Sequence, residues 1–263
     1  MTLGFSVNDL LPKARGGGQL KMGLIKLSED EWLDLKPDLA ARKAGFAAFP
    51  QGIQQTAESA PPIQELGAML GTVGDLQAIA QTTHEDLCLL TRAADDDQYR
   101  LIATAVAWPT DWHPADKIGK PLRALHAPIA GYEEQLATSV DAFMDKLKPG
   151  AIYGRANWFI APTPDKRWIA DAPAEQAFAH VTPENAGETL FVRSERQTLC
   201  PLPETGAILF AIGIYVEPLG ALSCANQAML VAAMETLLNG EGDRRGAPHY
   251  AAQLKTYVMR NLP

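Results

Sequence analysis

A dense set of charged and amide side chains lies in Arg193-Ser-Glu-Arg-Gln-Thr-Leu199. Apolar residues precede it at Phe191 and Val192 and follow it in Ala207-Ile-Leu-Phe-Ala-Ile-Gly-Ile-Tyr215, so both flanks are predicted to be strands. Charges held between strands are costly unless they are paired or bind an ion. Because a guanidinium grips both oxygens of a planar anion, the cluster predicts either a carboxylate or phosphate site, or an internal Arg–Glu network that fixes a loop.

Histidine and cysteine are sparse, which limits metal chemistry. None of the five histidines is spaced as His-x-x-x-His, and no carboxylate pair completes a metal triad, so a zinc or non-haem iron site has little support. His126 stands out because it lies among apolar residues just before a strongly periodic segment. It fits a hydrogen-bonded structural residue, a haem axial ligand or a pocket base. Cys200 offers a thiolate as another haem ligand, although a buried structural cysteine is the commoner case.

Composition and missing motifs exclude several classes of function. The net charge of −8 argues against binding to nucleic acid or to an anionic membrane. The sequence has no Gly-x-Gly-x-x-Gly, no Walker A motif and no nucleophile elbow. It also has no apolar run of about 18 residues and no apolar stretch typical of a secretory signal. Three cysteines far apart favour a reducing compartment, so we predict a cytoplasmic protein.

The elements that must position these residues follow from apolar spacing. We predict strands at 86–92, 99–108, 152–161, 189–193 and 207–216, and helices at 63–80, 132–147, 225–238 and 250–261. Ser28 and Glu31 predict a capping box at the start of a further helix with Trp32 on it. This order of elements predicts a single α+β domain with an antiparallel sheet flanked by helices. Residues 162–187 are predicted to be irregular, and 240–246 to form a hinge.

The first residues differ in composition from the rest. Residues 1–21 include Gly16-Gly-Gly18 and few apolar side chains, so we predict a flexible, peripheral lead-in that buries little. The domain itself is then expected to span residues 22–263.

Taken in order, a set of short motifs resembles the haem-dependent oxidative N-demethylase family. The motifs are Met22-Gly-Leu with Trp32, Glu85-Asp-Leu, Trp108-Pro with Trp112, Lys117-Ile-Gly, Pro121-Leu, His126 with Pro128, Arg155-Ala-Asn-Trp158, Arg193-Ser-Glu-Arg-Gln-Thr-Leu199 and Leu202-Pro-x-Thr-Gly-Ala-Ile-Leu-Phe210. Each motif is weak alone, but the ordered set, over about residues 22–220, is specific.

The resemblance implies a PAS-like core that holds haem b and oxidises a small secondary amine with O2, releasing formaldehyde. Electrons would come from NADPH through separate partner subunits with flavin and an iron–sulfur cluster, so this chain would be the haem-binding subunit, similar to the family's alpha subunit. His126 would be the metal ligand or a pocket base, and Glu195 is expected among the catalytic residues, where it would hold an arginine in place. The expected cofactor-binding residues are His126, Arg155, Asn157, Trp158, Arg193, Arg196, Gln197 and Phe210.

Two positions depart from the family pattern. Cys200 stands where a basic residue often follows Gln-Thr-Leu, and Gly213 stands where the strand often carries an arginine. Loss of basic groups from a pocket for anions would favour a second interpretation, a non-catalytic PAS-like sensor of haem or another small ligand. A purely structural subunit would leave the arginine cluster unexplained. Family membership supports the fold more firmly than the activity.

Overall fold

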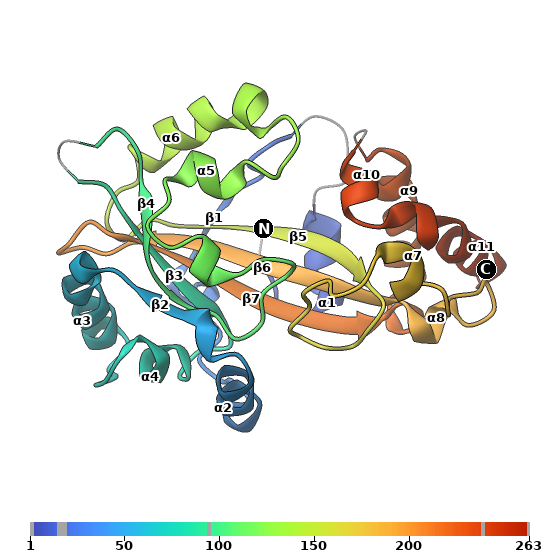
Figure 1. Ribbon diagram of the computed structural model, residues 1–263, viewed down its shortest axis with the longest axis horizontal. Coiled ribbons are helices and arrows are strands. Elements are labelled where there is room, and N and C mark those ends of the chain that lie inside the picture. Colours follow the sequence, from blue (N-terminus) through green and yellow to red (C-terminus); the bar gives the residue numbers. More distant parts are fainter. Residues whose placement is uncertain (1–2, 15–19, 94–95, 238–239, 262–263) are drawn as a thin grey trace.

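The computed structural model describes residues 3–14, 20–93, 96–237 and 240–261. Over these residues, seven strands form one antiparallel sheet in the order β1-β5-β6-β7-β3-β4-β2 (Figure 1). The strands are β1 (Ile25–Leu27), β2 (Ile53–Gln55), β3 (Asp86–Thr91), β4 (Arg100–Ala105), β5 (Ile152–Ala161), β6 (Phe191–Pro201) and β7 (Ile208–Pro218). The predicted α+β class with an antiparallel sheet is therefore confirmed.

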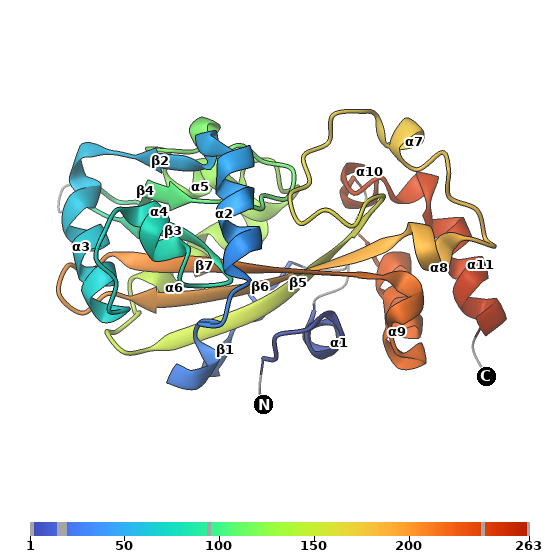
Figure 2. The same cartoon turned by 90° about the horizontal axis from the view of Figure 1, so that it is seen from below.

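The helices lie around this sheet. They are α1 (Val7–Leu10), α2 (Leu39–Ala48), α3 (Ala60–Met69), α4 (Leu76–Ala80), α5 (Leu122–His126), α6 (Thr138–Met144), α7 (Ala174–Ala177), α8 (Ala186–Thr189), α9 (Cys224–Glu235), α10 (Glu241–Arg244) and α11 (Ala251–Asn261). Helices α9 to α11 gather at one end of the long strands, and α3 and α4 lie towards the other end (Figures 1 and 2). Within the described chain, every helix is too short or too polar to cross a lipid bilayer.

The long strands β5, β6 and β7 set the two faces of the sheet. Directly paired residues share a face, and Glu195 pairs with Asn157 on β5 and with Ile214 on β7. Because side chains alternate along a strand, Glu195 points to one face and Arg196 to the other. We call the face of Glu195 the front face and the face of Arg196 the rear face.

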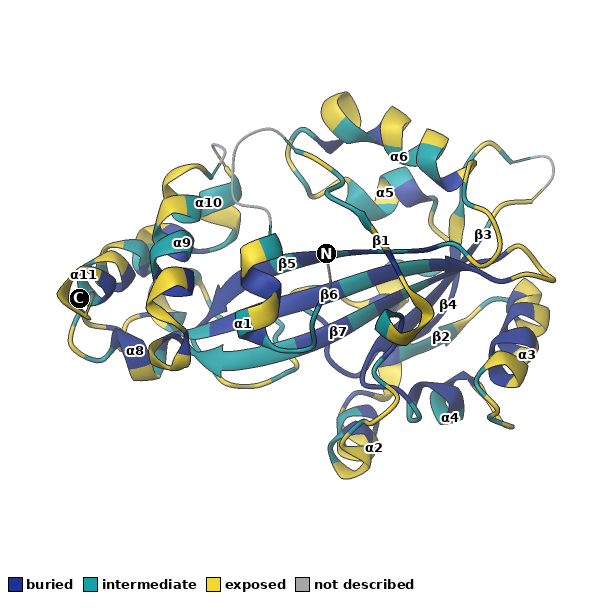
Figure 3. Ribbon diagram, turned by 180° about the vertical axis from the view of Figure 1, so that it is seen from behind, coloured by how far each residue is buried: buried dark blue, intermediate teal, exposed yellow. Residues whose placement is uncertain are grey.

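Different helices cover the two faces. Apolar side chains of α5 and α6 pack with β3 and β4 on the front face, where Leu122 and Met144 meet Leu90. On the rear face, α1, α3 and α4 pack along one half, and α9 and α11 pack with Val192 at the far end of β6. The central strands are largely buried, whereas the outward sides of the helices are exposed (Figure 3).

The N-terminal segment buries more apolar surface than its composition suggests. Leu3, Val7, Leu10 and Leu11 are each at most 1% exposed, and α1 contacts β6 and β7. The prediction that this segment buries little is therefore wrong for residues 3–14. Apolar residues three and four apart were the overlooked signal, because this spacing gives a short helix one buried side. Gly16-Gly-Gly18 lies outside the described residues.

Most predicted elements are present, with shifted ends. Strands β3, β4 and β5 fall within the predicted ranges, and α9 and α11 match the closing helices within three residues. The predicted helix at 63–80 is divided into α3 and α4, because Gly71 and Gly74 adopt left-handed backbone with φ of 65° and 147°. The capping box of Ser28 and Glu31 is confirmed, but it starts only the 3₁₀ turn Glu29–Glu31. Helix α2 begins later, after the N-cap Asp38.

Strand β6 is the largest departure from the sequence prediction. The predicted strand 189–193 is confirmed only at residues 191–193, because β6 runs from Phe191 to Pro201 and includes the whole charged cluster. Charged residues favour a loop on propensity, but here both faces of the strand are covered and the buried charges find partners. The cluster is therefore held rigidly in the centre of the sheet.

Candidate functional site

A cavity of about 680 Å³ lies on the front face of the sheet, between the strands and α5, α6 and α10. Apolar side chains form much of its wall, among them Leu90, Leu101, Leu136, Val140, Phe143 and Phe210. The polar side chains in the wall include Lys117, His126, Arg155, Asn157, Glu195 and Gln197. This volume and this mixture of surfaces are typical of a site for a small organic ligand or cofactor.

His126 is the last residue of α5 and faces this cavity. Its Nδ1 lies 2.9 Å from the carbonyl oxygen of Leu122, one helical turn earlier. A carbonyl can only accept, so Nδ1 carries the proton of that bond and Nε2 keeps a lone pair. The ring also stacks on Tyr132, with the centroids 4.4 Å apart and the planes at 11°.

The charge state of His126 suits a metal ligand. Burial among protein atoms lowers the pKa of its imidazole, and the positive charges of Arg155 and Lys117 lower it further. The bond to Leu122 opposes this shift and does not outweigh it. The imidazole is therefore neutral at neutral pH, as a metal ligand must be.

A π-helical turn at Glu133–Ala137 precedes α6 and shapes this side of the cavity. Such turns are rare in proteins, and those that occur are often found at functional sites. Tyr132, 4% exposed, stands at its start and supports the His126 ring. Burial raises the pKa of Tyr132 to about 12, so its phenol stays protonated.

Front-face residues of β5 and β6 line the floor of the cavity. Arg155 pairs with Gln197, and Asn157 pairs with Glu195, so the four side chains form a compact polar group. Gln197 Nε2 donates to Glu195 Oε2 over 2.9 Å. Arg155 Nη1 donates to the carbonyl of Met22 over 3.2 Å, which ties the segment before β1 to the cavity. These predicted site residues, with His126 and Phe210, do meet in one place.

The far end of the cavity contains three residues that the sequence analysis did not select. Glu241 Oε1 lies 2.6 Å from Arg244 Nη2 and 2.7 Å from Arg245 Nε. Arg245 also donates to the carbonyl of Trp158, and its guanidinium lies 4.6 Å from the centre of the Phe159 ring. The only signal was the charge-rich composition of residues 240–246, which is typical of any solvated hinge.

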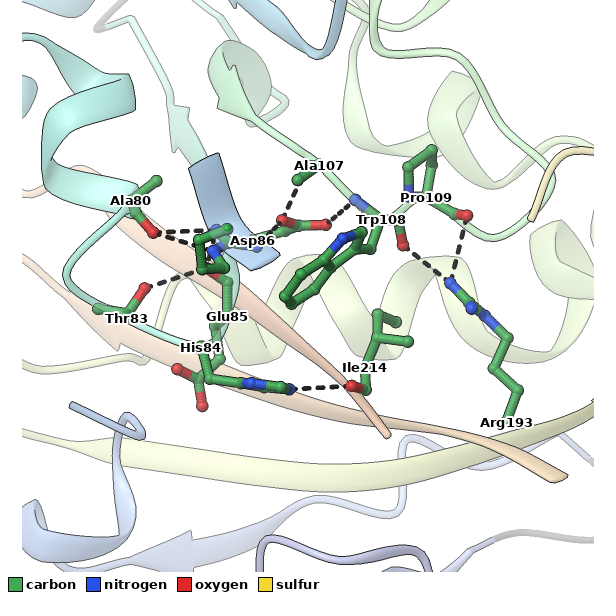
Figure 4. Close-up of polar contacts among 11 residues, drawn as sticks. Ala80, Thr83, His84, Glu85, Asp86, Ala107, Trp108, Pro109, Arg193 and Ile214 are labelled. Carbon is green, nitrogen blue, oxygen red and sulfur yellow. Dashed lines mark hydrogen bonds and ion pairs between the residues drawn. The ribbon is translucent and has the colours of Figure 1, made fainter. Parts of the chain in front are cut away.

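Arg193 does not line the cavity, although it was a predicted cofactor-binding residue. Its side chain is buried, and Nη2 donates to the carbonyl of Trp108 over 2.8 Å and that of Pro109 over 3.2 Å (Figure 4). Nε donates to Thr110 Oγ1 over 2.7 Å. Its guanidinium therefore holds the loop after β4, but through carbonyls and a hydroxyl rather than through the Arg–Glu network that the alternative predicted.

Arg196 and Trp158 lie on the rear face and do not line the cavity either. Arg196 donates to the carbonyls of Leu3, Glu31 and Trp32, and Nη1 lies 3.7 Å from Glu85 Oε1. Trp158 is packed in the apolar cluster beneath the C-terminal helices. Alternation along β5 and β6 sends both side chains away from the cavity, so neither is positioned to contact a ligand there.

The two departures from the family pattern also fall on the rear face. Gly213 pairs with Arg196, and a Cβ at this position would come 3.0 Å from the Tyr215 ring and 3.4 Å from Glu85. Cys200 is buried in the rear-face apolar cluster. Neither position faces the cavity, so neither departure removes a charge from its wall.

The donor set and the walls of the cavity fit a haem. A haem needs one axial protein ligand, apolar walls and cations for its carboxylates, and the cavity offers His126, a broad apolar surface and Arg155 with Lys117. In the described part of the chain, no three histidine, cysteine or carboxylate side chains gather to hold a bare metal ion.

A protein-family model covers most of the chain that forms this cavity. The family model described as haem-dependent oxidative N-demethylase, alpha subunit-like, matches residues 54–255, which is more than half of the chain. The chain belongs to this family. Apart from the segment at Leu20–Leu24, the residues that line the cavity lie within the match, including His126 and Glu195. The family resemblance inferred from the ordered motifs is thereby confirmed.

Proposed function

We propose that this protein binds haem b in the front-face cavity and acts as the haem subunit of an oxidoreductase. The proposed reaction is the O2-dependent oxidation of a small secondary amine, with release of formaldehyde. One observation carries the proposal: a neutral imidazole, fixed through Nδ1, presents Nε2 to a large apolar cavity in a member of this family.

The chain's own residues would divide the work of binding. His126 Nε2 would ligate the iron, and the apolar side chains of α6 and β7 would enclose the macrocycle and exclude water. Phe210 belongs to this enclosure, and Arg155 would add a positive charge to the floor that favours an acidic cofactor. When bound, haem supplies the activation of oxygen and the transfer of electrons.

We propose that Glu195 binds the substrate amine and accepts its proton. A secondary amine is protonated at neutral pH, and a buried carboxylate binds an ammonium strongly. Gln197 holds Oε2 of Glu195, so Oε1 is left to accept an N–H of the substrate and then its proton. Asn157, directly opposite on β5, would complete the polar surface that orients the amine.

Partners and location follow from the same proposal. The matching family is named for an alpha subunit, which favours a separate subunit that delivers electrons. We assign that role to a flavin and iron–sulfur reductase that takes electrons from NADPH. The sheet, together with α5 and α6 on its front face, would form a PAS-like core. The three cysteines are free thiols, which supports a cytoplasmic location.

Haem titration followed by absorption spectroscopy tests the proposal. Wild type is expected to take up about one haem per chain, and His126→Ala should shift the Soret band or abolish tight binding. His113→Ala tests the other candidate ligand, because His113 also lines the cavity. His113 is exposed, and its ring lies beside Phe49. His180→Ala, an exposed site outside the cavity, is the control.

The outcomes separate the possible functions. Folded wild type that takes up no haem would refute both the oxidoreductase and a haem sensor. Loss of haem binding in His113→Ala but not in His126→Ala would show that His113, and not His126, ligates the iron. Haem binding without amine-dependent O2 consumption, with an electron donor supplied, would establish the sensor instead.

A further inference from the structure

Positive charge is distributed unevenly along the cavity wall. Arg244 and Arg245 share the carboxylate of Glu241, which compensates one of their two positive charges. The negative charges of Asp111 and Glu195 also act on Arg244. Lys117 and Lys120 also line the cavity, but neither forms an ion pair with any described carboxylate. Lys117 is partly desolvated and Lys120 is exposed, and two neighbouring cations without a paired carboxylate among the described residues favour an anionic ligand.

Lys117 is half-buried and already oriented. Its Nζ donates to the carbonyl oxygen of Leu125 over 3.0 Å, at the end of α5 beside His126. An ammonium has three N–H donors, so two remain for a ligand. Burial lowers the pKa of the Lys117 ammonium, the charge of Lys120 lowers it further, and Asp116 opposes both.

The backbone around these two lysines is fixed to the sheet. Gly119 N donates to the carbonyl of Leu101 over 2.7 Å, and Leu101 N donates to the carbonyl of Lys120 over 3.2 Å. These bonds make residues 119–121 an extension alongside β4. Sites built on such fixed backbone lose little entropy when they bind.

We propose that Lys117 and Lys120 bind the carboxylate groups of the cavity ligand, which for haem are its two propionates. This inference rests on the proposed haem site and assigns to that site a polar edge beside α5. It places the acidic edge of the ligand next to His126 rather than at Arg244 and Arg245. The two lysines are thus positioning residues that set the orientation of the ligand in the cavity.

The test compares haem with its dimethyl ester, in which both carboxylates are blocked. Wild type should bind haem more tightly than the ester in absorption titrations. Lys117→Met and Lys120→Met should each weaken haem binding about tenfold, equivalent to about 1.4 kcal/mol, and leave ester binding unchanged. Lys146→Met, at an exposed lysine beyond α6, is the matched control. Circular dichroism shows whether each variant is folded.

Other results would overturn the assignment in distinguishable ways. Equal binding of haem and ester by wild type would refute the carboxylate site and leave the proposed haem function standing. A selective loss of haem over ester in Arg244→Met, and not in the lysine variants, would place the acidic edge at the far end. Binding of neither compound by folded wild type would refute the proposed function itself.

Discussion

Asp86 and Arg193 hold the two sides of a single residue, Trp108. Asp86 Oδ2 accepts from the amide N–H of Trp108 over 2.8 Å, and Arg193 Nη2 donates to its carbonyl oxygen over 2.8 Å (Figure 4). Asp86 Oδ1 also pairs with Arg42 over 2.8 Å. The next residues along the chain, from Thr110 to His113, line the cavity. Buried charge in the sheet therefore fixes one wall of the site without touching a ligand.

We predict that Arg193→Met lowers the free energy of unfolding by about 3 kcal/mol. The substitution keeps most of the side-chain volume but leaves several buried carbonyls, including those of Trp108 and Pro109, without a donor. Urea denaturation monitored by circular dichroism measures the loss. Arg92→Met, which removes an exposed pair with Asp145, should cost less than about 1 kcal/mol. Equal losses in both variants would show that Arg193 does not anchor the loop.

Glu85 is predicted to make stability depend on pH. It is fully buried on the rear face, and burial raises the pKa of its carboxyl to about 7, although the amide of Asp34 and the charge of Arg196 oppose the rise. The folded state therefore keeps a proton that the unfolded state loses near its ordinary value of 4.5. The stabilisation of the folded state by this proton is complete below about pH 4.5 and is lost as the pH rises through 7.

Unfolding of wild type and Glu85→Gln across this pH range measures the effect. The stability of the variant relative to wild type should increase from pH 4.5 to 7 and then remain constant. Each unit of raised pKa corresponds to about 1.4 kcal/mol at most. A stability difference that is independent of pH in this window would contradict the buried, protonated state.

The N-terminal segment gives a third prediction. Leu10→Ala should lower the free energy of unfolding by about 2–5 kcal/mol, because the side chain is fully buried under the rear face and its removal leaves a cavity. Leu35→Ala, at a leucine that is 61% exposed, is the matched control and should cost little. Thermal and urea denaturation of both variants provide the measurement. If Leu10→Ala and Leu35→Ala lower the free energy of unfolding equally, residues 3–14 do not belong to the core.

The sequence was informative where periodicity decides the structure. The alternation at Phe210 and Ile212 predicted strand β7, and the front face that it defines is the floor of the cavity. His126 could be selected because few histidines exist and one lies in an apolar setting. The roles of Arg193 and Arg196 could not be assigned, because a guanidinium satisfies backbone carbonyls as readily as it binds an anion.

Long-range contacts explain the residues that sequence reasoning missed. Glu241 and Arg245 reach the cavity only because α9 and α11 pack on the rear face and return residues 240–246 to the end of β5. No local pattern encodes such a return. The burial of Leu3 also depends on long-range contacts. Its amide donates to Glu31, and its carbonyl accepts from Arg196, which lies 193 residues away in sequence.

The last prediction concerns Glu195 as the group that binds the amine. Glu195→Gln preserves the shape of the side chain and a hydrogen-bond acceptor for Gln197, and it removes the negative charge. Haem uptake should therefore be unchanged. Binding of dimethylammonium to the haem-loaded protein, followed through the change in its absorption spectrum, should weaken about 10- to 100-fold, the range expected for the loss of a charged hydrogen bond. Glu58→Gln, at an exposed site in a 3₁₀ turn far from the cavity wall, is the matched control.

Discrimination between a charged and a neutral ligand separates a direct contact from a structural effect. If Glu195 binds the ammonium through its charge, wild type should discriminate dimethylammonium from a neutral molecule of similar size, and Glu195→Gln should lose that discrimination while it retains the neutral molecule. A variant that weakens both ligands equally would indicate that Glu195 only supports Gln197 and the floor of the cavity. In that case the amine must meet a different carboxylate, and the wall also contains those of Asp111, Asp116 and Glu241.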